Sequence, residues 1–271
     1  MSNGGEMKFG MPGAAAVGLM VMLSGAFGFP VNPAGAATDV SCNGTADSAS
    51  TIQARQLIDE LREELAPVEE QIRNHPYLTA LENGRSSREN LKAFAGEQYN
   101  IIQSDLRSIA LMVARFGVSP SGEFFRGFLE GEILAFGLLL DFAEALGLDE
   151  SDLKAYEPRP EAQTYPAYVT SLALYGSQAE IAAAFLVNFA VFGENTGRMS
   201  AALRSQYELS PEDTAFFDFF ATPIPGFECT ALTVIAAGLE HGAEPRAIKR
   251  ATRLLQAYEK QFWDASGSDG G

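Results

Sequence analysis

The sequence predicts an all-α bundle of several helices within a single domain. From residue 51 onward, apolar residues recur every three or four positions, and no alternating pattern typical of strands stands out. Glycine and proline separate these segments at close intervals, which indicates short connections. Helices joined in this way, without strands, pack as a compact bundle. We therefore expect a helical domain over residues 51–271, preceded by a leader and linker over residues 1–50.

Composition and charge are those of an acidic globular protein. The 271 residues include 19 Lys and Arg against 35 Asp and Glu, a formal net charge of −16. A hydrophobic fraction of 46% excludes an intrinsically disordered chain. Because nucleic-acid binding needs Lys and Arg to displace counterions from phosphates, we expect no nucleic-acid partner. With two His and two Cys, a dense disulfide framework and a structural zinc ribbon are excluded.

The leader has the order of features found in a secretory signal peptide. Lys8 precedes an apolar run from Ala14 to Phe29 and the small residues Ala34–Ala36. The run is shorter than the roughly 20 residues of a membrane span, so we expect no integral membrane span. A disordered leader, or a start codon placed too early, is an equal alternative to export. Cys42 could pair with Cys229 only if the leader folds back, which no pattern in the sequence indicates.

Proline and glycine define the first two predicted helices. The pattern predicts a helix over Ile52–Asn74 that is interrupted or kinked at Pro67. A short helix begins near Pro76 and ends at Asn83-Gly84, a common C-terminal stop.

A long helix follows, and it carries the first polar residues of interest. Ser86 with Glu89 forms a capping box at its start, and Gly117 ends it. Gln98 and Asp105 lie seven residues apart beside its apolar stripe, so they share a face.

Caps and breakers define the later helices. The expected segments are residues 122–146, a short capped turn after Asp149, residues 162–175, residues 177–207, a helix started by Ser210-Pro211, residues 227–241 and residues 245–265.

Polar residues also fall inside apolar stripes of the later helices. Asn188 and Asn195 lie on the stripe Ile181, Phe185, Phe192, Met199, and Glu259 lies on the stripe Ile248, Leu255, Phe262 with Tyr258 beside it. A buried amide without partners costs about 1–3 kcal/mol, and an unpaired buried carboxylate costs more. Each residue alone could simply bond to its neighbours and fix the packing. Taken together, Gln98, Asp105, Asn188, Asn195 and Glu259 predict a polar-lined cavity between facing helices.

An ordered set of short motifs resembles the TenA/thiaminase II and PqqC-like family. The matching segments are His75-Pro76-Tyr77-Leu78, Glu82-Asn83-Gly84, Phe94, Gln98-Tyr99, residues 142–148, Pro158-x-Pro160, Ala162-x-x-Tyr165, Gly176-x-x-Ala179-Glu180 and Tyr258-Glu259-x-x-Phe262-Trp263. The resemblance covers roughly residues 70–265 and implies a haem-oxygenase-like multi-helix bundle. It also implies a cytoplasmic location and a homo-oligomer.

The same resemblance implies altered chemistry. Where thiaminase II enzymes have Leu-Pro-Cys with the nucleophile, this chain has Leu186-Val187-Asn188, and an amide cannot replace a thiolate nucleophile. Tyr99 stands where the family has an acid, and Ile102 and Phe192 stand where it has tyrosines. Tyr165 and Glu259 match residues of the family. The resemblance implies that Glu259 transfers protons and binds an aminopyrimidine.

Three functions follow from these residues. The first is binding of a small heteroaromatic ligand by Gln98, Tyr99, Asp105, Tyr165, Asn188, Phe192, Asn195 and Tyr258, with Glu259 as the catalytic candidate. The second is a hydrolase that uses Glu259 as acid/base with water, and the third is a regulatory or structural partner without chemistry. We expect no cofactor and no metal, since a di-iron site needs about three His; Glu130 and Glu132 are interpreted as a solvated helix face.

Overall fold

The computed structural model describes residues 48–267, and these residues form helices and connections without a strand. All of them belong to one compact unit. In chain order the helices are α1 (Ala49–Arg73), α2 (Pro76–Glu82), α3 (Arg88–Phe116), α4 (Gly122–Ala145), α5 (Glu150–Ala155), α6 (Thr164–Tyr175), α7 (Gln178–Tyr207), α8 (Ala215–Ala221), α9 (Phe227–Glu240) and α10 (Pro245–Ser266). The all-α prediction is confirmed. The signal-like segment and Cys42 lie outside the described residues.

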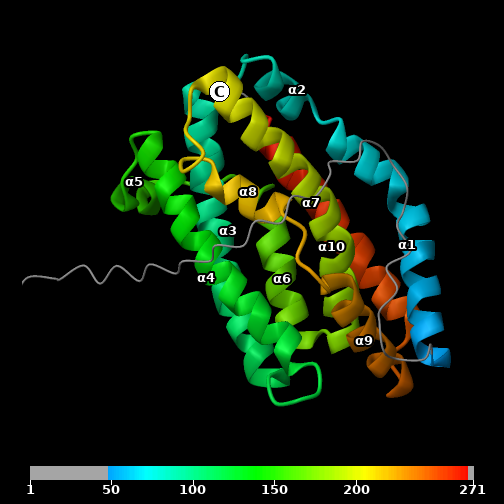
Figure 1. The fold of residues 1–271 in the computed structure, drawn as a ribbon. Helices are drawn as coiled ribbons and strands as arrows, with labels where there is room; N and C mark the ends of the chain where they lie inside the picture. Colours follow the sequence, from blue (N-terminus) through cyan, green and yellow to red (C-terminus); the bar gives the residue numbers. More distant parts are fainter. Residues whose placement is uncertain (1–47, 268–271) are drawn as a thin grey trace, which may run out of the picture. The chain divides into compact units, whose positions relative to one another are not determined.

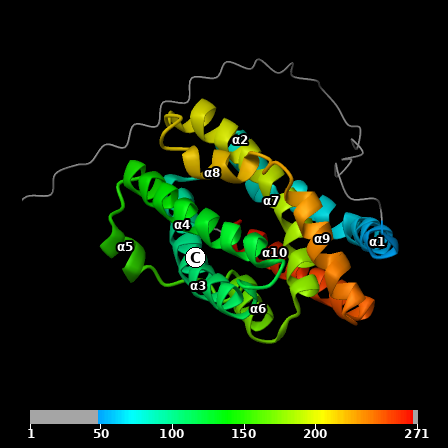
Figure 2. The ribbon, with the colours of Figure 1, turned by 60° about the horizontal axis from the view of Figure 1, so that its bottom comes forward.

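The helices α7 and α10 lie side by side at the centre of this arrangement (Figure 1). On one side of the pair, α3 packs against both α4 and α6, and α6 also contacts α10. On the other side, α1 packs against α9 and α10 (Figure 2). The short helix α8 contacts α7 and α4. The region between α3, α4, α7 and α10 is therefore enclosed by elements from distant parts of the sequence.

Most helix ends lie within a few residues of their predicted positions, but the cap of α3 is different. Ser87, not Ser86, caps this helix, because the Ser87 hydroxyl oxygen accepts the Asn90 backbone N–H at 3.1 Å. Ser86 is buried instead, and its backbone N–H donates to the Tyr207 hydroxyl at 3.0 Å. The predicted Ser86–Glu89 capping box is therefore wrong by one residue.

Two further expectations concern prolines. Of the two outcomes expected at Pro67, an interruption is wrong, because Pro67 lies inside the continuous helix α1. Ser210 caps a turn, not an α-helix: its hydroxyl accepts the Asp213 backbone N–H at 3.1 Å, and α8 begins only at Ala215.

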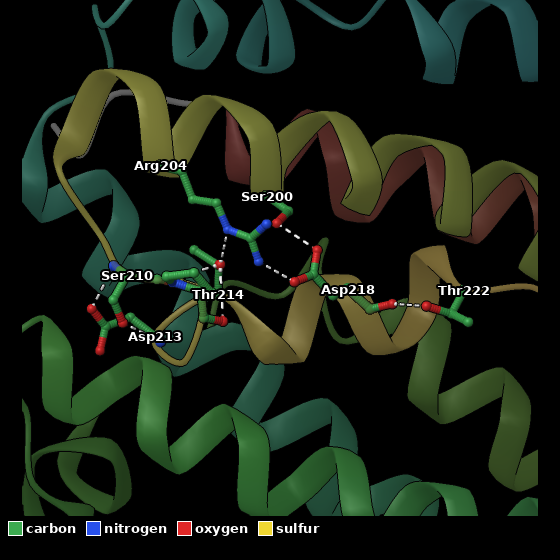
Figure 3. Close-up of polar contacts among 8 residues, drawn as sticks. Ser200, Arg204, Ser210, Asp213, Thr214, Asp218 and Thr222 are labelled. Carbon is green, nitrogen blue, oxygen red and sulfur yellow. Dashed lines mark hydrogen bonds and ion pairs between the residues drawn. The ribbon is translucent and has the colours of Figure 1, made fainter. Parts of the chain in front are cut away.

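A polar network holds α8 against α7 (Figure 3). The Arg204 guanidinium pairs with Asp218 and also donates to the Thr214 hydroxyl at 2.7 Å. The Ser200 hydroxyl donates to the other carboxyl oxygen of Asp218 at 2.7 Å. Because α8 is short, these contacts help to fix the position of the aromatic residues at its end, Phe219 and Phe220.

Glu97, on α3, binds the segment between α5 and α6 through hydrogen bonds. Its side chain is fully buried, and its carboxyl group accepts hydrogen bonds from the Tyr156 hydroxyl (2.8 Å), the Arg159 backbone N–H (2.8 Å) and the Gln163 amide (3.0 Å). Gly96 allows this approach, because a Cβ there would lie 2.4 Å from the Tyr156 ring.

We predict that Glu97→Ala lowers the free energy of unfolding by about 3 kcal/mol, because it leaves a cavity and three part-buried donors without an acceptor. Chemical denaturation measures the change. Glu144→Ala, on the exposed face of α4, is the control and should alter stability by less than about 0.5 kcal/mol. Equal effects of the two variants would contradict this role of Glu97.

Candidate functional site

A small cavity lies where α3, α4, α6, α7 and α10 meet. Its volume is about 40 Å³, and we call it the inner cavity. Its polar lining consists of Gln98, Asp105, Glu132, Tyr165, Asn188 and Glu259. The rest of the wall is apolar and includes Phe185, Phe189, Phe192, Phe220 and Phe262. A water molecule needs at least about 10–15 Å³ of such volume, so this space admits a few waters or a small chemical group.

A chain of hydrogen bonds connects the polar residues of α6, α7 and α10. The Tyr165 hydroxyl donates to the Asn188 side-chain oxygen at 3.1 Å, and the Asn188 amide lies 3.4 Å from the Gln256 oxygen. The Trp263 indole N–H donates to Glu259 at 2.7 Å, and Asn188 also hydrogen-bonds Glu259. Glu259 is thus held in place by groups that leave part of its carboxyl facing the cavity.

Three carboxyl groups from three different helices share this cavity, and burial favours their neutral forms. Burial raises the pKa of Glu259 to about 7, although hydrogen bonds from Trp263 and Asn188 oppose the shift. Burial also raises the pKa of Glu132 to about 8. The pKa of Asp105 is raised well above its ordinary value by burial, and the charges of Glu132 and Glu259 raise it further.

None of the described residues that line the cavity is a Lys, Arg or His. One carboxyl oxygen of Asp105, a residue that is only 6% exposed, has no hydrogen-bond partner. The acids therefore meet in an apolar wall with unused hydrogen-bonding capacity and no basic side chain to neutralise them. A ligand that donates hydrogen bonds, or carries positive charge, would satisfy this environment.

The structure brings together six of the predicted site residues and separates three. Gln98, Asp105, Tyr165, Asn188, Phe192 and Glu259 line the cavity. Tyr99, Asn195 and Tyr258 do not. The Tyr99 hydroxyl donates to Glu150, the Asn195 amide donates to the Ile72 carbonyl at 3.2 Å, and Tyr258 packs against Tyr168. Successive residues of a helix point about 100° apart, so the neighbours of Gln98 and Glu259 face elsewhere.

Glu132 was interpreted as a solvated helix residue, and the structure corrects this. Glu130 is exposed, but Glu132 is only partly exposed and lines the inner cavity. The sequence contains the signal for it: Phe125, Phe128, Ala135 and Leu139 form a stripe at spacings of three and four on which Glu132 falls.

Cys229 does not line the inner cavity. This residue, near the start of α9, is disulfide-bonded. Cys42, the other cysteine of the chain, lies outside the described residues. Within residues 48–267, no three His, Cys, Asp or Glu side chains are grouped so that they could hold a metal ion. In the same range, no helix combines the length and apolar character that a membrane crossing requires.

Several solved structures share this fold. A TenA homologue from Pseudomonas syringae pv. tomato is 15% identical, with a TM-score of 0.65 over 81% of this chain and 97% of that one. A TenA homologue from Pyrococcus furiosus is 19% identical, with a TM-score of 0.63 over 78% and 99%. A domain of unknown function with a haem-oxygenase-like fold, from Shewanella denitrificans, is 16% identical, with a TM-score of 0.60 over 77% and 91%.

These likenesses establish the haem-oxygenase-like fold expected from the sequence. Among curated proteins, none matches the chain. The sequence profile of the TENA/THI-4/PQQC family matches residues 62–269, which is most of the chain and includes every residue of the inner cavity. The protein is therefore a member of the TENA/THI-4/PQQC family.

Proposed function

We propose that this protein binds a small heteroaromatic ligand through an amino group that donates hydrogen bonds to the acids of the inner cavity. The observation that carries the proposal is the meeting of Asp105, Glu132 and Glu259 in an apolar wall without a basic residue. The rings of Phe192 and Phe220, in edge-to-face contact with centroids 5.0 Å apart, add aromatic surface at the same cavity.

The thiaminase II reaction itself is not proposed. By the resemblance, Asn188 stands where thiaminase II enzymes have their nucleophile, and an amide cannot act as one. Asn188 hydrogen-bonds Tyr165 and Gln256, and the disulfide-bonded Cys229 offers no thiolate. The proposal is therefore binding with lost or altered chemistry.

A second candidate function is hydrolysis with Glu259 as acid/base and water as nucleophile. It is favoured by the pKa of Glu259, which burial raises to about 7, near the value that suits proton transfer at neutral pH. The inner cavity, at about 40 Å³, also has room for an attacking water. A purely structural or regulatory role has no comparable observation in its favour.

Glu259→Gln should weaken binding of aminopyrimidines about tenfold, because a carboxyl group that can ionise against the ligand's amino group is replaced by an amide that cannot. The variant keeps an oxygen for the Trp263 indole N–H, so the fold should survive. Thermal shift and calorimetric titration with aminopyrimidines and thiamin check this. Glu130→Gln, on the same protein but exposed, should bind as the parent does. Absence of stabilisation of the parent by any of these compounds would contradict the proposed function.

The stability of the ligand-free protein should depend on pH through the cavity acids. Because burial raises the pKa of Glu132 to about 8 from an ordinary value of 4.5, the folded protein keeps a proton that the unfolded chain has released. The free energy of unfolding should therefore fall as the pH rises from about 4.5 to about 8. Glu132→Gln should flatten this slope, whereas Glu130→Gln should not. Denaturation at several pH values measures it, and equal slopes in the two variants would contradict the assignment.

If the second candidate function holds, thiamin fragments with an exocyclic amino group should release ammonia slowly in the presence of the protein. Glu259→Gln should abolish this turnover even at saturating substrate, because the remaining amide cannot transfer a proton. Product analysis by mass spectrometry gives the readout. Turnover that persists in Glu259→Gln, or that is absent in the parent protein, would remove this candidate.

A further inference from the structure

A second and much larger space adjoins the inner cavity. It has a volume of about 790 Å³ and lies between α4, α7 and the segment that joins α8 to α9; we call it the outer groove. Glu132, Phe189 and Phe220 line both spaces. These shared side chains place the two spaces next to each other.

The inner cavity and the outer groove differ so much in volume that they can accommodate only different parts of a ligand. The inner cavity holds a few atoms, whereas the outer groove is within the range of sites that take ligands of drug size. The two most buried acids, Asp105 and Glu259, line only the inner cavity, whereas Glu132 lines both spaces. A ligand that satisfies those acids can insert only a small head group there, and the rest of its body must lie in the outer groove.

The wall of the outer groove is aromatic. Phe124 stacks on Phe227 with ring centroids 5.8 Å apart, and Phe128 stacks on Phe189 at 5.4 Å. Phe219 and Phe220, positioned by the α7–α8 network of Figure 3, complete this wall. Rings of this kind bind an apolar or aromatic body by burying its surface from water.

Charged residues at the outer groove favour a ligand without negative charge. Glu123, Glu194 and Glu228 line the groove together with Arg62. Arg62 pairs with Glu228 at 3.1 Å, so its charge is already matched. Glu194 is likewise paired, with Arg73. Glu123 and Glu132 remain, and no unmatched basic side chain lines the groove to attract a negative charge.

Glycines keep the floor of the outer groove open. Gly127 and Gly131 lie four residues apart on α4, and both line the groove. A Cβ at Gly127 would meet no atom within 4 Å, and one at Gly131 would meet only the Phe219 ring, at 3.7 Å. The Cβ of a larger residue at position 127 would therefore not collide with the rest of the protein, so packing does not explain the glycine there. In the middle of a helix, glycine is destabilising by roughly 0.5–1 kcal/mol relative to alanine.

We propose that the ligand is an amphiphile: an amino-bearing head group enters the inner cavity, and an extended apolar or aromatic tail lies in the outer groove over Gly127. This inference rests on the proposed function and narrows its ligand class. The tail is recognised by burial against phenylalanine rings, and the head by hydrogen bonds to the cavity acids.

Two probes and two matched variants of the full chain test the tail site. The probes are 4-amino-2-methylpyrimidine and the same ring carrying a hexyl chain on carbon 5. Gly127→Leu adds a side chain at the outer groove, about 7.5 Å along α4 from Glu132, at a position where a Cβ meets no atom within 4 Å. Gly137→Leu is the control, because Gly137 lies on the same helix, also has open space, and does not line the groove. Calorimetric titration gives the dissociation constants.

We expect the hexyl chain to tighten binding at least tenfold in the parent and in Gly137→Leu. In Gly127→Leu this gain should disappear, while the affinity of the short probe stays within twofold of the parent value. Binding of the short probe without a gain from the chain, or a gain that survives in Gly127→Leu, would overturn this inference alone. Failure of both probes to bind would overturn the proposed function together with it.

Discussion

The organising constraint of this structure is that three carboxyl groups, two of them buried and one partly buried, line one cavity without a basic partner. Asp105 from α3, Glu132 from α4 and Glu259 from α10 line one cavity among phenylalanine rings. An interior of low polarity penalises their charge, and the charges of Glu132 and Glu259 raise the pKa of Asp105 further. A fold that served only stability would replace such groups by apolar side chains at little cost. Their presence is the physical reason to infer a ligand that supplies hydrogen-bond donors or positive charge.

Much of this could be predicted from the sequence, because helical periodicity reports directly which face of a helix is buried. Asn188 and Glu259 lie on apolar stripes of α7 and α10, and both are buried as those stripes require. Gln98 and Asp105, seven residues apart, reach the same cavity. The helix order, and the resemblance at the closing Tyr-Glu-x-x-Phe-Trp motif, placed the fold correctly.

Asn195 and Glu132 have surroundings other than those expected, because helical periodicity does not report which elements pack against one another. The position of a residue on a buried stripe does not show which helix it packs against. Asn195 lies on the stripe of α7, but its amide donates to the carbonyl of Ile72 at the end of α1. On α4 the exposed Ile133 and Leu134 blur the pattern, so the face that carries Glu132 is hard to identify without knowing where α7 packs. The outer groove depends on the position of α8, which is fixed by Arg204 and Asp218 across a turn, and no local pattern encodes that contact.

Direct titration of the cavity acids tests the central claim most simply. In protein labelled with ¹³C at Asp and Glu carboxyl carbons, NMR spectra recorded against pH, with Glu132→Gln and Glu259→Gln for assignment, report the protonation of each group. The account predicts that Glu259 titrates near pH 7 and Glu132 near pH 8, and that an amino-bearing ligand shifts both signals. Titration of both groups in the ordinary range of exposed glutamates, near pH 4.5, would contradict it.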